Sequence, residues 1–190
     1  MKALREIGLG KALKYALLTL AMAFYHLLVF SPWRVCFLRL LGARIGKNVV
    51  LHNTKFFNCY RRGFPGLHIG DQCFIGDDCL FDLADEVHLD NQVTLGERVV
   101  VLTHINVGFH DHPLQKYFPA SSERVIFEEG CFIGASVTLL KGVTVGRGAF
   151  VAAGSLVNRD IEPHHVVAGV PAKTIRVLPQ NEAVGGASMS

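Results

Sequence analysis

The sequence predicts a mainly β fold, a β-helix preceded by a helical segment. An apolar residue recurs every six residues over most of the chain, and a small residue, often Gly or Asp, tends to follow it. A compact residue, often Val or Cys, comes four positions after each apolar residue. A fixed period of six is typical of β-helices, in which three strand-and-corner units make one triangular coil. The repeat is carried by Ile45, Leu51, Phe57, Ile69, Ile75, Phe81, Leu89, Leu95, Val101, Phe127, Ile133, Leu139, Val145, Val151 and Val157.

Two helices are predicted before the repeat begins. Residues 15–30 (YALLTLAMAFYHLLVF) are nearly all apolar and rich in Ala, Leu and Met, which favour helix. Ser31 and Pro32 predict a break and a new start, with Ser31 as the N-cap and Pro32 at the first helical position. The second helix is predicted over residues 33–41 and ends at Gly42.

Residues 1–42 form a basic, apolar segment that suits two roles. Residues 1–47 carry eight Lys or Arg and one acid, whereas the rest of the chain carries eleven basic and fifteen acidic residues. No small-x-small cleavage motif follows the apolar run, which disfavours a signal peptide. The run is also shorter than the roughly 20 apolar residues of a transmembrane span. The segment therefore favours peripheral contact with the inner face of a membrane, or a cap on the open end of the β-helix.

The β-helix is predicted over residues 43–160, with a closing segment at 161–179 and a polar tail, 180–190, expected to be disordered. Between Phe57 and Ile69 no apolar residue keeps the register, which predicts a bulge. Between Val101 and Phe127 lie about twenty extra residues, which predict a loop over residues 103–124. Extra residues in a solenoid form loops on one face, commonly the binding face.

Composition and charge exclude several classes of function. With 190 residues, half of them hydrophobic, we expect one domain with a sizeable core. The net charge is +3, but no basic stripe interleaved with aromatic residues points to nucleic acid. The five cysteines form no CxxC pair, and Cys73, Cys79 and Cys131 occupy the compact corner position, where Cys is a small apolar filler. This usage favours a reducing, cytoplasmic compartment.

The stretch from Phe127 to Arg176 resembles the hexapeptide-repeat acyltransferases of the left-handed parallel β-helix type. It reads FEEGCFIGASVTLLKGVTVGRGAFVAAGSLVNRDIEPHHVVAGVPAKTIR, and its closing AGVPAKTIR is among the more specific parts. The resemblance covers about residues 40–177 and is closest to acetyltransferases of polysaccharide, maltose and galactoside type. It implies left-handed crossovers, an exception to the usual rule. It also implies a homotrimer, acetyl-CoA bound in the groove between adjacent β-helices, and a loop histidine as base.

The residues point independently to similar chemistry. Acetyl transfer from a thioester to a sugar hydroxyl requires removal of the hydroxyl proton, and a neutral imidazole suits this task at cytoplasmic pH. The oxyanion that forms needs a donor, which a backbone N–H of a β-helix turn can supply. No covalent intermediate is needed, so Cys59, which lies off the corner register, is not required as a nucleophile.

Three loop histidines are candidates for the base. His104 comes three residues after Val101, at the root of the loop, where the rigid coil would hold a catalytic group. His112 lies in a His-Pro-Leu stretch that resembles maltose-type enzymes, and His110 lies in a His-Asp pair that resembles colanic-acid-type relatives. We favour His104, and His110 and His112 stay open as alternatives.

Other candidate site residues follow from the resemblance. Asp78 and Asp82 lie one coil before His104, at a level where relatives hold the acceptor or orient the base; turn formation is the other interpretation. Small residues would let the pantetheine of coenzyme A approach the backbone, and two terminal cations would meet its phosphates. These coenzyme residues are Gly134, Ala135, Ala153, Gly154, Lys173 and Arg176. No metal is expected.

Two other functions compete with acetyl transfer. A β-helix carbonic anhydrase binds zinc through three histidines across a subunit interface, but here the histidines cluster in one loop. A non-catalytic trimeric scaffold would need neither the long loop nor its histidines. The sequence therefore favours an acetyl-CoA-dependent acetyltransferase that acts on a hydroxyl of a sugar or lipid-linked saccharide.

Overall fold

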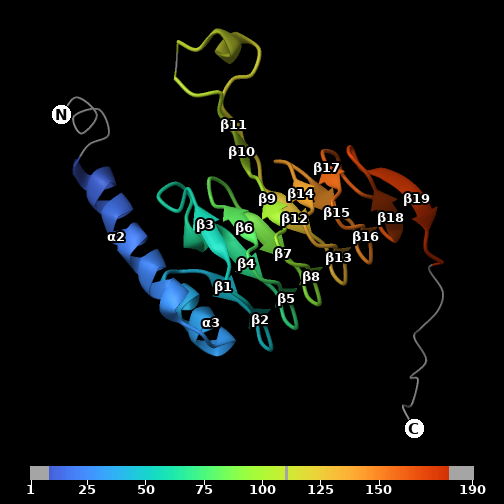
Figure 1. Ribbon diagram of the computed structural model, residues 1–190, viewed down its shortest axis with the longest axis horizontal. Coiled ribbons are helices and arrows are strands. Elements are labelled where there is room, and N and C mark those ends of the chain that lie inside the picture. The colour runs from blue at the N-terminus through green and yellow to red at the C-terminus, as the bar shows by residue number, and fades with distance from the viewer. Residues whose placement is uncertain (1–8, 110, 180–190) are drawn as a thin grey trace.

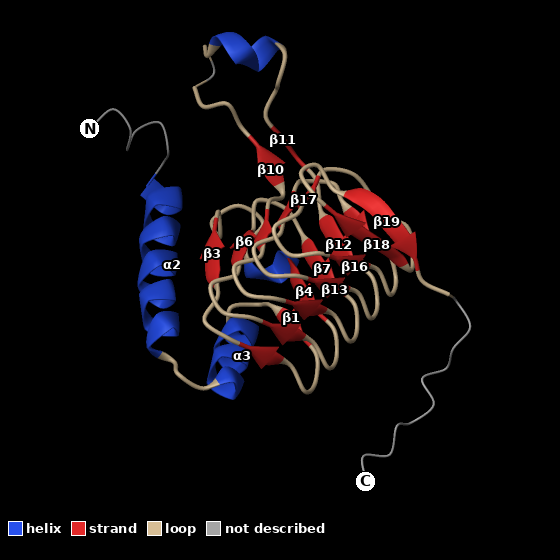
Figure 2. Ribbon diagram, turned by 45° about the vertical axis from the view of Figure 1, so that its right-hand side comes forward, coloured by secondary structure: helices blue, strands red, loops and turns tan. Residues whose placement is uncertain are grey.

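The computed structural model describes residues 9–109 and 111–179, which form a left-handed parallel β-helix with two helices at its N-terminal end (Figures 1 and 2). Three sheets make the three sides of the prism. Sheet A contains β1 (Arg44–Ile45), β4 (Leu67–Ile69), β7 (Val87–Leu89), β12 (Val125–Phe127) and β15 (Thr144–Val145). Sheet B contains β2 (Val50–Leu51), β5 (Phe74–Ile75), β8 (Thr94–Leu95), β13 (Phe132–Ile133), β16 (Phe150–Val151), β18 (His165–Ala168) and β19 (Lys173–Val177). Sheet C contains β3 (Lys55–Phe57), β6 (Leu80–Asp82), β9 (Val100–Val101), β14 (Thr138–Leu139) and β17 (Leu156–Val157).

The six-residue period places one apolar side chain of each strand in the core. Side chains alternate between the two faces of a strand, so a two-residue strand has one inward and one outward position. In sheet C, for example, Phe81, Val101, Leu139 and Val157 share one register and are all buried. The thiols at the corners (Cys73, Cys79 and Cys131) are buried as well. Burial raises the pKa of Cys79 to about 11 and that of Cys131 to about 12, so these thiols stay neutral fillers.

One inward position differs from the sequence prediction. Phe56, not Phe57, pairs with Phe81 in the register of sheet C, and the two rings stack with centroids 5.7 Å apart. Phe57 instead pairs with Asp82, the last residue of β6. The shift by one residue turns the ring of Phe57 away from the core, because neighbouring residues of a strand point to opposite faces.

Within the described residues, two helices precede the β-helix, α2 (Leu9–Leu27) and α3 (Ser31–Leu40). The predicted cap at Ser31 is wrong, because Phe30 is the N-cap and Ser31 lies inside the helix. The Ser31 hydroxyl accepts a hydrogen bond from the Leu51 N–H at 2.8 Å, which ties α3 to the first coil. Gly42 follows the helix with φ of 102°, and a Schellman motif ends α3 at this residue, where the sequence predicted the end of the helix.

Helix α2 packs beside the prism with one face and leaves the other exposed (Figure 2). Tyr25 is fully buried on the packed face, and its hydroxyl lies 2.7 Å from Thr54 Oγ1. No helix within the described ranges is both long enough and apolar enough to cross a bilayer.

The segments that add residues to the period all occur where sheet C passes to sheet A. The first contains a short 3₁₀ helix, η1 (Phe64–Gly66), the second joins β6 to β7, and the third joins β9 to β12. The third is the long loop, which begins and ends as an antiparallel ribbon of β10 (His104–Ile105) and β11 (Ser121–Ser122). The ribbon projects from the prism, and its outer end carries a second 3₁₀ helix, η2 (Pro113–Lys116) (Figure 1). Three successive coils thus place their irregular segments at one corner.

Candidate active site

The corner between sheets C and A holds a buried carboxylate in contact with a histidine. Asp82 ends β6, and Thr103 and His104 follow β9 on the next coil. The register pairs Phe81 with Val101, so the residues that leave each strand emerge side by side. His104 Nδ1 forms a short hydrogen bond with Asp82 Oδ2. The Asp82 side chain is fully buried, whereas 22% of the His104 side chain is exposed.

Four donors satisfy the two oxygens of Asp82. Oδ1 accepts from Asn58 Nδ2 at 2.8 Å and from the Ala84 N–H at 3.1 Å. Oδ2 accepts from the Thr103 N–H at 3.0 Å in addition to His104. Burial opposes ionisation, but the hydrogen bonds from Asn58, His104 and the two backbone N–H groups outweigh it and hold the Asp82 pKa below its usual value. Asp82 is therefore an anion held in one orientation.

The ionised carboxylate decides which tautomer His104 adopts. A carboxylate only accepts hydrogen bonds, so Nδ1 must carry the hydrogen that lies between the two groups. The neutral ring then has its lone pair on Nε2, which forms no hydrogen bond with any residue of 9–109 or 111–179. A carboxylate that fixes the tautomer of a histidine and stabilises its protonated form is the arrangement of a general base.

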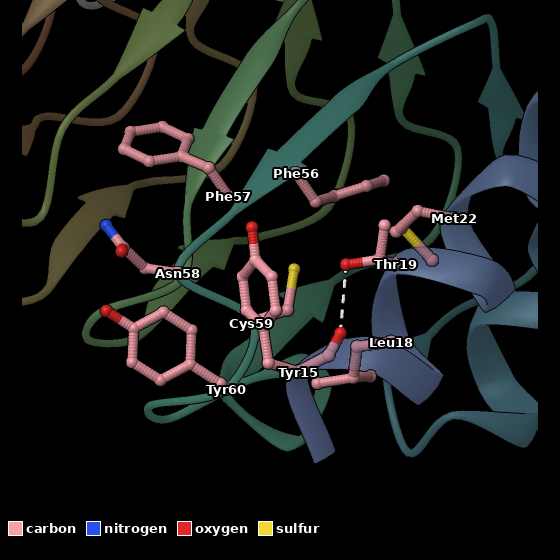
Figure 3. Close-up of a pocket in the computed structure, with 9 residues that line it drawn as sticks. All are labelled: Tyr15, Leu18, Thr19, Met22, Phe56, Phe57, Asn58, Cys59 and Tyr60. Carbon is pink, nitrogen blue, oxygen red and sulfur yellow. Dashed lines mark hydrogen bonds between the residues drawn. The ribbon is translucent and has the colours of Figure 1, made fainter. Parts of the chain in front are cut away.

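A pocket lies beside this pair, between α2 and the end of β3 (Figure 3). Its volume is about 480 Å³, within the range of small-molecule sites. It is lined by Tyr15, Leu18, Thr19, Met22, Phe56, Phe57, Asn58, Cys59 and Tyr60. Asn58 also bonds Asp82, and the Phe57 ring centroid lies 6.4 Å from that of His104, so the pocket adjoins the base. Aromatic rings with a few polar groups suit a sugar ring and its hydroxyls.

The other two loop histidines do not share this corner. His112 is exposed at the outer end of the ribbon, where its Nδ1 accepts from the Leu114 N–H at 3.2 Å and caps η2. His110 lies outside the described residues. Only His104, of the two described candidates, contacts a buried carboxylate.

Asp78 does not join Asp82. It lies at the opposite end of sheet C, in the corner before β6, with φ of 58° and an ion pair from its Oδ1 to Lys55 Nζ at 2.8 Å. This matches the turn-forming interpretation, because Asp tolerates a left-handed conformation.

Four of the six predicted coenzyme residues, Gly134, Ala135, Ala153 and Gly154, lie at that same opposite corner, between sheets B and C. The Gly154 N–H donates to the Ala135 carbonyl at 2.9 Å, and exposed Ala153 precedes Gly154. A Cβ on Gly134 would lie 2.5 Å from the Ala153 nitrogen, so the next coil already requires glycine there. Lys173 and Arg176 are exposed on β19, beyond the last coil of sheet B. Within one chain, this corner and His104 lie at opposite ends of one side of the prism. A unit of six extended residues makes that side about 20 Å long at most.

Neither a cluster of metal ligands nor an activated thiol is present in the part of the single chain that the structure describes. Within residues 9–109 and 111–179, no group of three or more His, Cys, Asp or Glu side chains is placed to hold a metal ion. Cys59 lines the pocket, but burial raises its pKa to about 11, so its thiol is not poised as a nucleophile.

Sequence reasoning missed Asn58, Thr103 and the pocket. Asn58 follows β3 just as Asp82 ends β6, on the same side of the prism. The signal was present in the spacing, because the third, sixth and ninth apolar positions, Phe57, Phe81 and Val101, are each followed by a gap longer than six residues.

Comparisons with known proteins agree with this architecture. A family described as the hexapeptide repeat of succinyl-transferase matches residues 124–159. A protein of Escherichia coli (strain K12) named as a colanic acid biosynthesis acetyltransferase, WcaF, is 31% identical over 157 residues, which cover 81% of this chain and 80% of that protein. A maltose O-acetyltransferase from Clostridium difficile 630 superposes with a TM-score of 0.75 at 22% identity, over 91% of this chain and 90% of that one. A galactoside acetyltransferase in complex with coenzyme A gives 0.75 at 23% identity, over 90% and 84%.

Proposed function

The chain belongs to the hexapeptide-repeat acetyltransferases, and from this premise we propose that it transfers an acetyl group from acetyl-CoA to a hydroxyl of a saccharide, with His104 as general base. The observation that carries the proposal is the hydrogen bond between buried Asp82 and His104, which leaves Nε2 free to accept a proton. The named activities of the related proteins, on colanic acid, maltose and galactosides, favour a sugar as the acceptor.

In the proposed reaction the acceptor hydroxyl attacks the thioester carbonyl while His104 Nε2 takes its proton. A C–O bond forms and the tetrahedral oxyanion is stabilised by a backbone N–H of a β-helix turn. Collapse of the intermediate breaks the C–S bond, and the imidazolium returns the proton to the leaving thiolate. Asp82 stabilises the imidazolium throughout, because its depressed pKa keeps it ionised.

We propose a homotrimer, because one chain does not bring the two halves of the site together. The corner with Ala135, Ala153 and Gly154 lies a full prism side from His104, so coenzyme A would be held between that corner of one subunit and His104 of the next. The outward face of sheet B supports association. Phe132 and Phe150 stack there with centroids 4.8 Å apart, although both are about 40% exposed in the single chain.

We propose that the acceptor binds in the pocket between α2 and the end of β3. We also propose that the enzyme works in the cytoplasm, at the inner face of the membrane. The hydroxyls of Tyr15 and Tyr60 and the amide of Asn58 lie on the side of the pocket nearest Phe57 (Figure 3). A lipid-linked saccharide is the acceptor that would combine such a pocket with the basic, apolar segment 1–42.

The test is release of free thiol from acetyl-CoA by the purified protein, with maltose, a galactoside and colanic acid oligosaccharides as acceptors. We expect release that depends on one of these saccharides and an acetyl ester on the product by mass spectrometry. Release that is unchanged by every saccharide, in the presence of an intact fold, contradicts the assignment of a sugar acceptor.

A further inference from the structure

Helix α2 is apolar on two opposite faces. Leu18, Met22 and Tyr25 pack against the core or lie in contact with it. Leu13, Leu17, Leu20, Phe24 and Leu27 are between 52% and 74% exposed. At about 100° per residue these five fall within an arc of about 80°, centred roughly 150° from the packed face. A helix that only capped the prism would carry polar residues on this outer face.

The exposed apolar stripe continues around the turn into α3. Phe30 is 60% exposed and Trp33 is 58% exposed, and their rings meet edge to face with centroids 5.0 Å apart. We name the five α2 residues together with Phe30 and Trp33 the outer ridge. Single exposed apolar residues are ordinary on a protein surface, but a contiguous row of them marks an interaction site.

The charge of the segment that carries the outer ridge indicates what covers the ridge. Residues 1–47 carry eight basic residues and one acid. Lys14, Arg34 and Arg39 donate to backbone carbonyls, and in the part of the chain that the structure describes none of them is paired with a carboxylate. A second copy of this chain on the same surface would bring like charges together. An anionic lipid surface complements them, and a Trp beside an apolar ridge suits the interface between headgroups and acyl chains.

We propose that the outer ridge docks the protein on an anionic lipid bilayer and presents the acceptor pocket to saccharides anchored in that bilayer. One helix separates the two features, because the opposite side of α2, through Tyr15, Leu18 and Met22, forms a wall of the pocket. Docking therefore holds the pocket about 10 Å, one helix diameter, from the membrane surface. The acceptor class that follows, a membrane-anchored saccharide, rests on the proposed function.

The test is sedimentation of the full chain with vesicles of phosphatidylcholine, with and without phosphatidylglycerol. We expect binding to the mixed vesicles that weakens with salt. The double variant Leu20→Gln, Phe24→Gln keeps helix propensity but removes two ridge side chains. Burial of each of these two side chains in the bilayer contributes about tenfold to the partition coefficient, so the variant should bind the vesicles about a hundredfold more weakly. The matched control is Ile175→Thr, Val177→Thr, which removes two side chains of similar exposure, 66% and 55%, from β19 and should bind as the wild type does.

The outcomes separate this proposal from the catalytic one, because vesicle binding needs neither acetyl-CoA nor an acceptor. Wild-type protein that stays in solution with anionic vesicles overturns the proposal, whatever its activity. Equal loss of binding in the ridge variant and in the β19 control also overturns it. If the ridge variant changes only the oligomeric state by light scattering, the outer ridge is a contact between copies of the chain and not a membrane surface. Circular dichroism confirms that each variant is folded.

Discussion

Replacing Asp82 by Asn tests the central piece of the mechanism. The substitution keeps the shape of the side chain but removes its charge and replaces one oxygen by an NH2 group. Four N–H donors face the two oxygens of Asp82, so the new NH2 group must meet two of them in either orientation. If the NH2 group faces His104, it donates to Nδ1 and forces the tautomer that carries its hydrogen on Nε2. Nε2 then cannot accept a proton. Toward Asn58, it leaves the His104 imidazolium beside a neutral amide.

Both orientations remove stabilisation of the protonated base. Loss of the buried carboxylate in comparable His–Asp pairs lowers the rate by up to about 10⁴, and loss of general-base catalysis lowers it by at least about 10². We therefore expect kcat to fall by about 10² to 10⁴, which is roughly 2.7 to 5.5 kcal/mol of barrier. One buried backbone N–H, of Thr103 or Ala84, loses its acceptor, which costs about 1–3 kcal/mol of stability.

The assay is thiol release from acetyl-CoA with the saccharide that the wild type accepts, together with urea unfolding. The matched control is Asp90→Asn, because Asp90 also bonds a histidine, His88 Nε2 at 2.9 Å, but on an exposed surface where both side chains are over 40% accessible. That variant should retain wild-type kcat. If the kcat values of Asp82→Asn and Asp90→Asn both stay within about fivefold of the wild-type value, Asp82 does not support the base and the reasoning is wrong.

Three further outcomes are expected. His104→Ala should abolish saccharide-dependent thiol release, whereas His112→Ala should retain most of it, because His112 caps η2 at the far end of the ribbon; the reverse pattern would move the base to the loop tip. Asp82 has a folded-state pKa below its unfolded value of about 3.9, so its contribution to unfolding free energy is present above pH 4 and lost as the pH falls through the folded pKa. The stability gap between wild type and Asp82→Asn should therefore narrow in acid urea titrations, and a gap that widens there would contradict the sign of the pKa shift. Gly134→Ala should lower the free energy of unfolding by about 1–3 kcal/mol, because the added Cβ would overlap the backbone of the next coil. Gly10→Ala should be neutral or stabilising, because nothing lies within 4 Å of the added Cβ. Equal melting temperatures for the two variants would refute the overlap argument.

Some residues of the candidate site could be predicted from the sequence, and others could not. His104 was predicted because it lies three residues after Val101, at the point where the period breaks. Asp82 was predicted from its place one coil earlier, and Asp78 was predicted with it, but the two lie at opposite ends of β6. Asn58 was missed because Phe57 was assigned inward, and the register that places Phe56 inward instead is visible only across two strands.

The repeat alone determined the β-helix, its apolar corner thiols and its buried residues, with the exception of Phe57. Those properties depend on side-chain alternation along a strand and on a period that each coil repeats, so a single chain displays them in order. The tertiary structure decided which residues meet between coils. Asp82 and His104 are 22 residues apart, and Asn58 lies 24 residues before Asp82. Neither separation is a whole coil of the regular repeat, because each passage from sheet C to sheet A adds its own number of residues. The stacking of the coils brings these three side chains together, and the irregular lengths that allow it follow no period.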